Sequence, residues 1–208
     1  MQRNVFFLEG AIGCGKSTVL DACPETFECV RENLDVWREL NYPRLAYESP
    51  QEHAWNFQSL VLATQQHDLA AALQTNAQTI VVERSVVSNG IFAELLHEDE
   101  AISELQMGIY RQQHKAAALA MKMLCSGCNV QHIWLDVSAD DCLDRLKERN
   151  KARGDKDGES AVDYTYQQRL FLKHQKDFSC PTTPLGNVTR MSNPSVDAVV
   201  HYMFYTKH

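Results

Sequence analysis

Residues 5–18 read VFFLEGAIGCGKST. The first four residues of this stretch are apolar and β-prone, a glycine-rich turn follows them, and residues 16–22 are compatible with a helix. Residues 10–17 fit the pattern GxxxxGK[ST] completely, in the strand-to-helix context that a phosphate-binding loop requires. The alternative, a glycine-rich turn that arose by chance, does not account for that context. The stretch therefore predicts a strand, a phosphate loop and a helix.

The predicted loop carries the donors that a nucleoside triphosphate needs. Backbone N–H groups and the helix N-terminus attract phosphate oxygens, while Lys16 reaches the β- and γ-phosphates and Ser17 ligates Mg²⁺. The loop residues expected to bind the phosphates of ATP are Gly10, Ala11, Gly13, Cys14, Gly15, Lys16, Ser17 and Thr18. Motors, GTPases and small-molecule kinases share such a loop, so the motif leaves the phosphate acceptor open.

Strand-like and helical patterns alternate along the rest of the chain. Further strand-sized runs occupy residues 27–30, 79–82, 130–135 and 188–191, and helical patterns occupy residues 51–74, 86–96, 101–124, 139–151, 163–178 and 195–205. Strands that alternate with helices imply a parallel sheet covered on both faces. We therefore predict an α/β protein with a P-loop NTPase fold, a five-stranded parallel sheet flanked by helices, and one domain over residues 1–208.

Composition narrows the classes of partner. With 208 residues, 44% of them apolar, the chain can bury one substantial core, and its net charge of −7 argues against gripping a nucleic-acid backbone. The apolar runs are too short to span a membrane, and the strand pattern begins too early for a leader, so we expect a cytoplasmic protein. The seven cysteines are expected to be reduced, and Cys125, Cys128 and His132 lack the partner motif of a zinc site.

Three polar clusters lie where a loop-bound triphosphate would need them. The clusters are Glu32 with Trp37, Tyr47 with Phe57 and Gln58, and the run Glu83-Arg84-Ser85. With these residues the sequence resembles the deoxyribonucleoside kinase family, which includes deoxycytidine, deoxyguanosine and thymidine-type kinases. The resemblance covers nearly the whole chain in order. It implies nucleotide salvage, in which the γ-phosphate of ATP is transferred with Mg²⁺ to the 5′-hydroxyl of a deoxyribonucleoside.

By resemblance, Glu32 is the base that takes the proton of the 5′-hydroxyl, since the family places this acid five residues before a Trp, here Trp37. An alcohol is a poor nucleophile at neutral pH, so a carboxylate at the end of a strand is a sensible general base. Taken alone, Glu32 would more often be a solvated acid at a strand end. The spacing to Trp37 favours the catalytic role.

The resemblance assigns the nucleoside and the metal to the other clusters. Tyr47 stands eleven residues before Gln58, as does the tyrosine that binds the sugar 3′-hydroxyl relative to the glutamine that reads the base. Phe57 alone would pass as a core residue. Glu83 helps to hold Mg²⁺ and Arg84 lies by the 5′-oxygen as a catalytic group beside Lys16, whereas a buried Glu–Arg pair without catalytic duty is the alternative.

A polar stretch over residues 150–160 is either a plain surface loop or a mobile lid. Arg145 and Arg149 precede it on one helix face, and the family's lid carries arginines at this spacing that clamp the transferred phosphate. The resemblance therefore predicts a short lid over about 145–160, with Lys151 at the place of a third arginine and Arg153 as the residue that could compensate for it. It also gives Glu159 the place of the acid that contacts the 3′-hydroxyl.

The family positions that tune base choice hold Gln65 and Asn89 here, so both an Arg–Asp pair and a fully apolar pocket are absent. The chain is one residue short before Phe92, the aromatic expected against the base. The amide of Gln58 favours a pyrimidine, thymidine or deoxycytidine. A homodimer through the long helices follows from the resemblance alone.

Two other functions remain open. Thymidylate kinase shares the loop and the Glu–Arg pair, and an Arg near the second strand would hold its monophosphate acceptor; here that position is Glu32, although Arg31 adjoins it. A nucleotide-binding subunit without turnover would keep the loop but would not need Glu32, Arg84 or an arginine-bearing lid.

Overall fold

The computed structural model describes residues 2–206, and its centre is a five-stranded parallel sheet. The strands are β1 (Asn4–Glu9), β2 (Phe27–Val30), β3 (Thr79–Glu83), β4 (Asn129–Asp136) and β5 (Asn187–Ser192). Their order across the sheet is β2-β3-β1-β4-β5, and each neighbouring pair is parallel. This order confirms the predicted α/β class and the five-stranded parallel sheet.

Helices connect the strands. They are α1 (Lys16–Asp21), α2 (Leu34–Glu39), α3 (Arg44–Glu48), α4 (Pro50–Ala72), α5 (Val86–Glu98), α6 (Glu104–Leu124), α7 (Ala139–Arg153), α8 (Tyr164–Phe178) and α9 (Val196–Tyr205), with a 3-10 turn η1 (Glu159–Ala161). Several begin where a side-chain oxygen accepts a backbone N–H of the first turn, as Ser138 does for α7 and Asp163 for α8. A capping box between Ser103 and Gln106 makes α6 begin at Glu104, three residues later than predicted.

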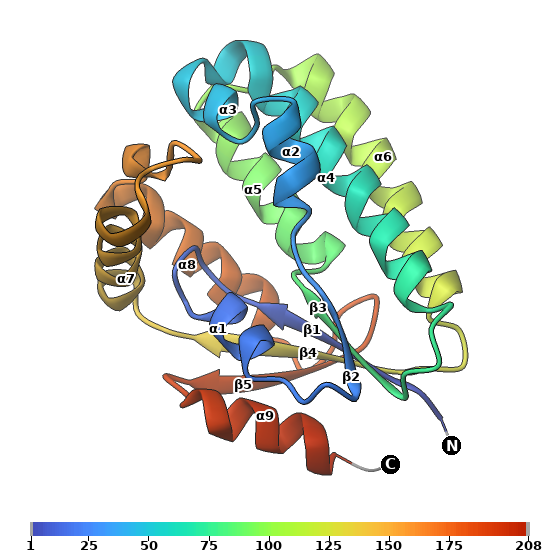
Figure 1. Cartoon of the computed structure of the whole chain (residues 1–208). Coiled ribbons are helices and arrows are strands. Elements are labelled where there is room, and N and C mark those ends of the chain that lie inside the picture. The colour runs from blue at the N-terminus through green and yellow to red at the C-terminus, as the bar shows by residue number, and fades with distance from the viewer. Residues whose placement is uncertain (1, 207–208) are drawn as a thin grey trace.

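The sheet is covered on both faces because its central strands are apolar on both sides. Val5 and Phe7 of β1 belong to the core beneath α4 and α6, whereas Phe6 and Leu8 belong to the core that includes residues of α1 and α9. In Figure 1, α4, α5 and α6 lie above the sheet and α9 lies below it. No helix among residues 2–206 is long and apolar enough to cross a membrane.

Two short helices, α2 and α3, were not predicted, and they lie between β2 and the long helix α4. At the predicted lid, α7 continues to Arg153, two residues past the expected end, and Gly154 then leaves the helix with φ 75°. Residues 154–158 are irregular, and η1 leads into α8. The carboxyl ends of the strands point toward the side where α7 lies (Figure 1), and the candidate site is on that edge.

Candidate active site

The loop of residues 10–17 joins β1 to α1 as predicted. Gly13 has φ +82°, and a Cβ there would lie 2.3 Å from the carbonyl oxygen of Cys142 in α7, so only glycine fits. The Lys16 ammonium is buried and donates to the carbonyl of Ala11 at 3.0 Å. Gly10 and Ala11 form the floor beneath this lysine, while residues from Gly13 to Thr18 line the open side.

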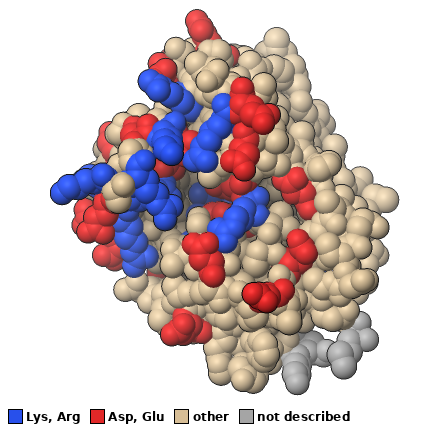
Figure 2. Space-filling view, in the orientation of Figure 1, with Lys and Arg blue, Asp and Glu red and all other residues tan. Residues whose placement is uncertain are grey.

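A cavity of about 1530 Å³ opens in front of the loop. Its wall includes residues from the phosphate loop, β2–α2, α3, α4, β3–α5 and the predicted lid. Figure 2 shows Lys and Arg side chains gathered on this face among acidic ones. The cationic residues that line the cavity are Lys16, Arg31, Arg38, Arg84, Arg145, Arg149, Arg153, Lys156 and Arg169. Eight Asp or Glu residues line the same cavity, so the wall as a whole is close to neutral, and Lys16 with the arginines supplies the groups that can pair with the phosphates of a ligand of nucleotide size.

Arg84 joins the predicted base to the phosphate loop. Its Nε donates to Glu32 Oε1 at 2.7 Å, and its NH1 donates to the carbonyl of Gly10 at 2.7 Å. Burial would lower the pKa of Arg84, but the charges of Glu32 and Glu83 outweigh it and raise that pKa. Arg84 also has φ 64°, a strained conformation that non-glycine residues adopt where the surroundings enforce it. The structure therefore fixes one buried cation between a carboxylate and the loop.

Glu83 and Ser17 bring oxygen atoms together beside this cation. Ser17 Oγ donates to Glu83 Oε1 at 3.1 Å, and this bond joins the first turn of α1 to the end of β3. Burial raises the pKa of Glu83, and the charge of Glu32 raises it further, while Lys16 and Arg84 lower it. A hydroxyl and a carboxylate at the edge of a phosphate loop are hard oxygen donors, so these residues fit a magnesium ion held together with phosphates.

Aromatic and amide side chains form the far wall. Phe57 lies between Trp37 and Tyr42, with ring centroids 5.3 Å from each, and Trp37 Nε1 donates to Thr64 Oγ1 at 3.1 Å. Gln58 is buried, lines the cavity, and its amide makes no hydrogen bond with another described residue. That amide is available to a ligand, as the base-reading role requires.

Tyr47 of α3 also lines the cavity. Burial, followed by the nearby Tyr166 and Glu159, raises the pKa of Tyr47 well above its usual range. Its hydroxyl is therefore neutral and can donate a hydrogen bond.

Gln65 and Asn89 form a neutral pair. Asn89 Nδ2 donates to Gln65 Oε1 at 2.7 Å, and Gln65 Nε2 donates to the carbonyl of Arg84 at 2.7 Å. Asn89 and Phe92 line the cavity, and the Arg84 guanidinium lies 4.7 Å from the centre of the Phe92 ring. The Asn89 amide N–H is thus engaged with Gln65, and the Asn89 side chain forms part of the cavity wall.

The lid residues divide in the structure. Arg145 donates to the carbonyl of Cys14 at 3.3 Å, and Arg149 pairs with Glu159. Burial raises the pKa of Glu159, and Arg149 lowers it. Arg153 lines the cavity and Lys151 does not, which places Arg153, rather than the residue at the expected position, on the wall.

Sequence reasoning missed a clasp between the lid and α2. Arg38 donates from Nε and NH2 to the two carboxylate oxygens of Asp157, at 2.8 and 2.7 Å. Beyond it, a Cβ on Gly158 would lie 3.4 Å from the side chain of Tyr47. The irregular segment therefore contacts the two helices that the sequence did not predict, and it forms part of the cavity wall on that side.

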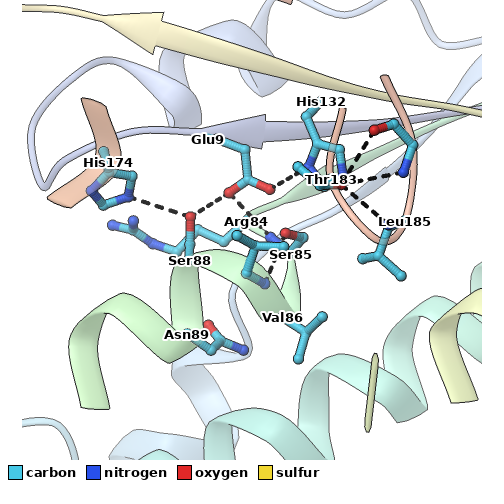
Figure 3. A network of polar contacts seen from close by, with 12 residues as sticks. Glu9, Arg84, Ser85, Val86, Ser88, Asn89, His132, His174, Thr183 and Leu185 are labelled. Carbon is cyan, nitrogen blue, oxygen red and sulfur yellow. Dashed lines mark hydrogen bonds and ion pairs between the residues drawn. The ribbon is translucent and has the colours of Figure 1, made fainter. Parts of the chain in front are cut away.

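A buried polar network beneath the loop was also missed (Figure 3). Glu9 accepts from His132 Nδ1 at 2.8 Å, from the Ser85 N–H at 3.3 Å, and from Ser88 Oγ. Burial raises the pKa of Glu9, but His132, Ser85 and Ser88 outweigh it and bring that pKa to about 2. His132 Nε2 accepts from Thr183 at 2.9 Å. An ionised carboxylate thus ties β1, β4 and the start of α5 together.

Both ring nitrogens of His132 are engaged, one with Glu9 and the other with Thr183. Within residues 2–206 no group of three His, Cys, Asp or Glu side chains is placed to hold a metal ion. All seven cysteines are free thiols, as expected.

The fold and the site together describe an α/β protein with a phosphate loop at the edge of a parallel sheet and a cavity lined by charged, amide and aromatic side chains. The family model described as deoxynucleoside kinase matches residues 6–193, and the chain belongs to that family. The chain is 33% identical over 171 residues to a fowlpox virus protein named "Probable deoxycytidine kinase FPV151", covering 81% of this chain and 69% of that protein.

Other relatives carry different substrate names. The thymidine kinase of Ictalurid herpesvirus 1 is 27% identical over 180 residues, covering 82% of this chain and 72% of that protein. The deoxycytidine kinase of Mus musculus is 26% identical over 199 residues, covering 81% and 72%. These names agree on a deoxynucleoside kinase and differ in the base.

Proposed function

We propose that the protein transfers the γ-phosphate of ATP to the 5′-hydroxyl of a deoxyribonucleoside. The observation that carries this proposal is the contact of Arg84 with both the Glu32 carboxylate and the Gly10 carbonyl. A carboxylate held beside a phosphate loop is what an alcohol acceptor needs, because the hydroxyl must lose its proton as it attacks. The family to which the chain belongs supports the same reaction.

In this proposal each residue at the site has a role that follows from its position. Glu32 accepts the proton of the 5′-hydroxyl, and Arg84 offsets charge on the phosphoryl group. Lys16, Arg145 and Arg149, which line the cavity, would contact the phosphates of ATP. When bound, Mg²⁺ would neutralise phosphate charge, and Ser17 with Glu83 would hold it. The clasped lid excludes water, which would otherwise compete with the nucleoside as acceptor.

We infer that the acceptor is a pyrimidine nucleoside, thymidine or deoxycytidine. Gln58 presents a free amide, which offers one acceptor and two donors to a base edge, between the aromatic wall and Asn89. The pair Gln65 and Asn89 carries no charge, so it neither demands nor repels an amino group on the base. In the proposed binding mode Trp37, Phe57 and Phe92 contact the nucleoside, and Tyr47 and Glu159 bind its 3′-hydroxyl.

Thymidylate kinase is the second candidate, and one contact disfavours it. Arg31, the residue that could hold an acceptor phosphate, pairs with Asp21 at 2.7 Å on the exposed rim. Glu32 would in addition repel a monophosphate placed beside Arg84. A binding subunit without turnover is disfavoured because a strained, buried Arg84 serves no purpose in binding ATP alone.

The proposal is tested by offering acceptors separately with ATP and Mg²⁺. We expect phosphorylation of thymidine or deoxycytidine, with kcat/KM at least about tenfold above that for deoxyadenosine or deoxyguanosine, the ratio that 1.4 kcal/mol of differential binding gives. Turnover of thymidine monophosphate alone would transfer the assignment to nucleotide kinases. Equal turnover of purine nucleosides would reject the pyrimidine preference while leaving the kinase in place.

We further propose a cytoplasmic homodimer. Seven free cysteines fit a reducing compartment. On α6 a row at alternating spacings of four and three residues is exposed and largely apolar, with Leu105 at 76%, Ile109 at 44%, Leu119 at 60% and Met123 at 68% exposure. Such a row suits packing against another helix.

Sedimentation should show a dimer of the wild type at micromolar concentration. The double substitution Leu119→Glu and Met123→Glu should give a monomer, because each partner would then bury charge. The matched control, Leu172→Glu on α8, changes an exposed leucine elsewhere and should leave the dimer intact. A monomeric wild type would reject this proposal.

A further inference from the structure

Gln167 is a buried amide on α8 that no catalytic role requires. Its side chain is 0% exposed, and Nε2 donates to the carbonyl of Ile12 inside the phosphate loop. The contact joins residues 155 positions apart. Oε1 has no hydrogen-bond partner among the described residues. Among the described residues, the Ile12 carbonyl is therefore the one hydrogen-bond partner of the Gln167 amide.

The position of Gln167 in α8 would suit an apolar residue better. The buried row of this helix is Gln167, Leu170, His174 and Phe178, at spacings typical of a helix face in a core. An amide in this row loses its hydration and leaves Oε1 unsatisfied, which a leucine of similar volume would avoid. Stability of the fold therefore does not explain the amide, and its contact with the loop remains as the reason for it.

The planarity of the Ile12–Gly13 peptide determines how the contact with Gln167 orients the loop. In a trans peptide the C=O of Ile12 and the N–H of Gly13 point in opposite directions. Gln167 holds the Ile12 carbonyl toward α8, so the Gly13 N–H points away from Gln167, and both Ile12 and Gly13 line the cavity. That N–H makes no hydrogen bond to another described residue. A free N–H on this loop is available as a donor for phosphate oxygen.

Neighbouring contacts hold the rest of the same turn. The carbonyl of Cys142 in α7 closes against Gly13, and Arg145 donates to the carbonyl of Cys14. Without Gln167, the Ile12–Gly13 peptide would be the part of this turn that could rotate and present its carbonyl to the anion. Rotation of this peptide would replace the attraction between the Gly13 N–H and a phosphate oxygen by a repulsion between that oxygen and the Ile12 carbonyl.

We propose that Gln167 is a positioning residue for the phosphate donor: it fixes the Ile12–Gly13 peptide so that the Gly13 N–H faces the phosphates of ATP. The inference rests on the proposed function only in naming ATP as the ligand. It predicts a defect confined to ATP binding, whereas a plain tether between α8 and the loop would affect stability and both substrates alike.

The test compares Gln167→Leu with Gln168→Leu, its exposed neighbour on the same helix. Titration calorimetry with ATP and Mg²⁺, without acceptor, should show a dissociation constant raised about five- to tenfold for Gln167→Leu, the effect of one lost hydrogen bond. The midpoint of urea unfolding and the KM for the nucleoside should stay at the wild-type values. Gln168→Leu should match the wild type in every measurement.

Gln167→Glu gives a second readout, since a carboxyl group donates to the Ile12 carbonyl only when it is protonated, and burial raises its pKa. The ratio of its ATP dissociation constant to that of the wild type at the same pH should decrease as the pH is lowered from 8 to 6. An unchanged ATP constant for Gln167→Leu, or a ratio for Gln167→Glu that rises on acidification, would overturn the inference. A wild type that binds ATP but phosphorylates no nucleoside would reject the proposed function and leave this inference standing.

Discussion

Glu32→Gln is expected to lower kcat for the nucleoside by about 10²- to 10⁴-fold, the usual contribution of a general base. The substitution keeps the volume of the side chain and one oxygen that can accept from Arg84 Nε, now 2.7 Å from Glu32 Oε1. It removes the negative charge and the capacity to take a proton. The attacking hydroxyl would then have no positioned carboxylate to take its proton.

Binding should change little in this variant, because Glu32 is not among the contacts to the phosphates. We expect the dissociation constant for ATP to remain near the wild-type value and the loss of activity to lie in kcat, while the unfolding midpoint falls because the buried Arg84 loses one of its two compensating carboxylates. Glu39→Gln, on the exposed side of α2, is the matched control and should keep full activity. A kcat for Glu32→Gln within about threefold of the wild type would show that another group or water accepts the proton.

The fold was predictable where one local pattern decides each element. Predicted and observed strands agree within one residue at each end, because buried parallel strands are short apolar runs between polar turns. The helices α2 and α3 were missed because six and five residues are too few to show a helical period. Their boundaries depend on packing against α4 and the lid, which the local sequence does not contain.

For the site, the meeting of Glu32, Glu83 and the phosphate loop could be predicted, since the carboxyl ends of parallel strands share one edge. Gln167, however, looks like any polar residue in a helix, and its partner Ile12 is 155 residues away. The clasp of Arg38 and Asp157 spans 119 residues. Contacts of this kind are set by the tertiary fold and leave no spacing signal in a single sequence.

His174 gives the second large effect, an acid sensitivity of the fold. The ring is 0% exposed, and Nδ1 lies 2.8 Å from the carbonyl of Leu170, so this nitrogen carries the proton of the neutral ring. Burial, followed by the charge of Arg84, lowers the pKa of His174 to about 3. Protonation would place a second cation in the core beside Arg84. The Glu9 carboxylate, shown in Figure 3, offsets only part of that cost.

The direction of the pH effect follows from comparing the two states. With an ordinary pKa of about 6.5 when unfolded, His174 binds a proton in the unfolded chain and not in the folded one between pH 6.5 and 3. Stability is therefore complete above pH 6.5 and falls as the pH is lowered. The loss is about 1.4 kcal/mol at pH 5.5 and at most about 5 kcal/mol at pH 3.

Urea unfolding at pH 7.5 and pH 5.5 tests this histidine through the difference between the wild type and His174→Gln, because groups common to both proteins, such as Glu9 with its pKa of about 2 and Glu83 and Glu159 with their raised pKa values, cancel in that difference. His174→Gln should be less stable than the wild type at pH 7.5 and should lose about 1.4 kcal/mol less between the two pH values. His67→Gln, on a ring that is 81% exposed, is the control and should keep the wild-type pH dependence. If His174→Gln loses as much stability as the wild type does, the buried ring accepts a proton near its ordinary pKa, and the core around Arg84 is more permissive to charge than its burial indicates.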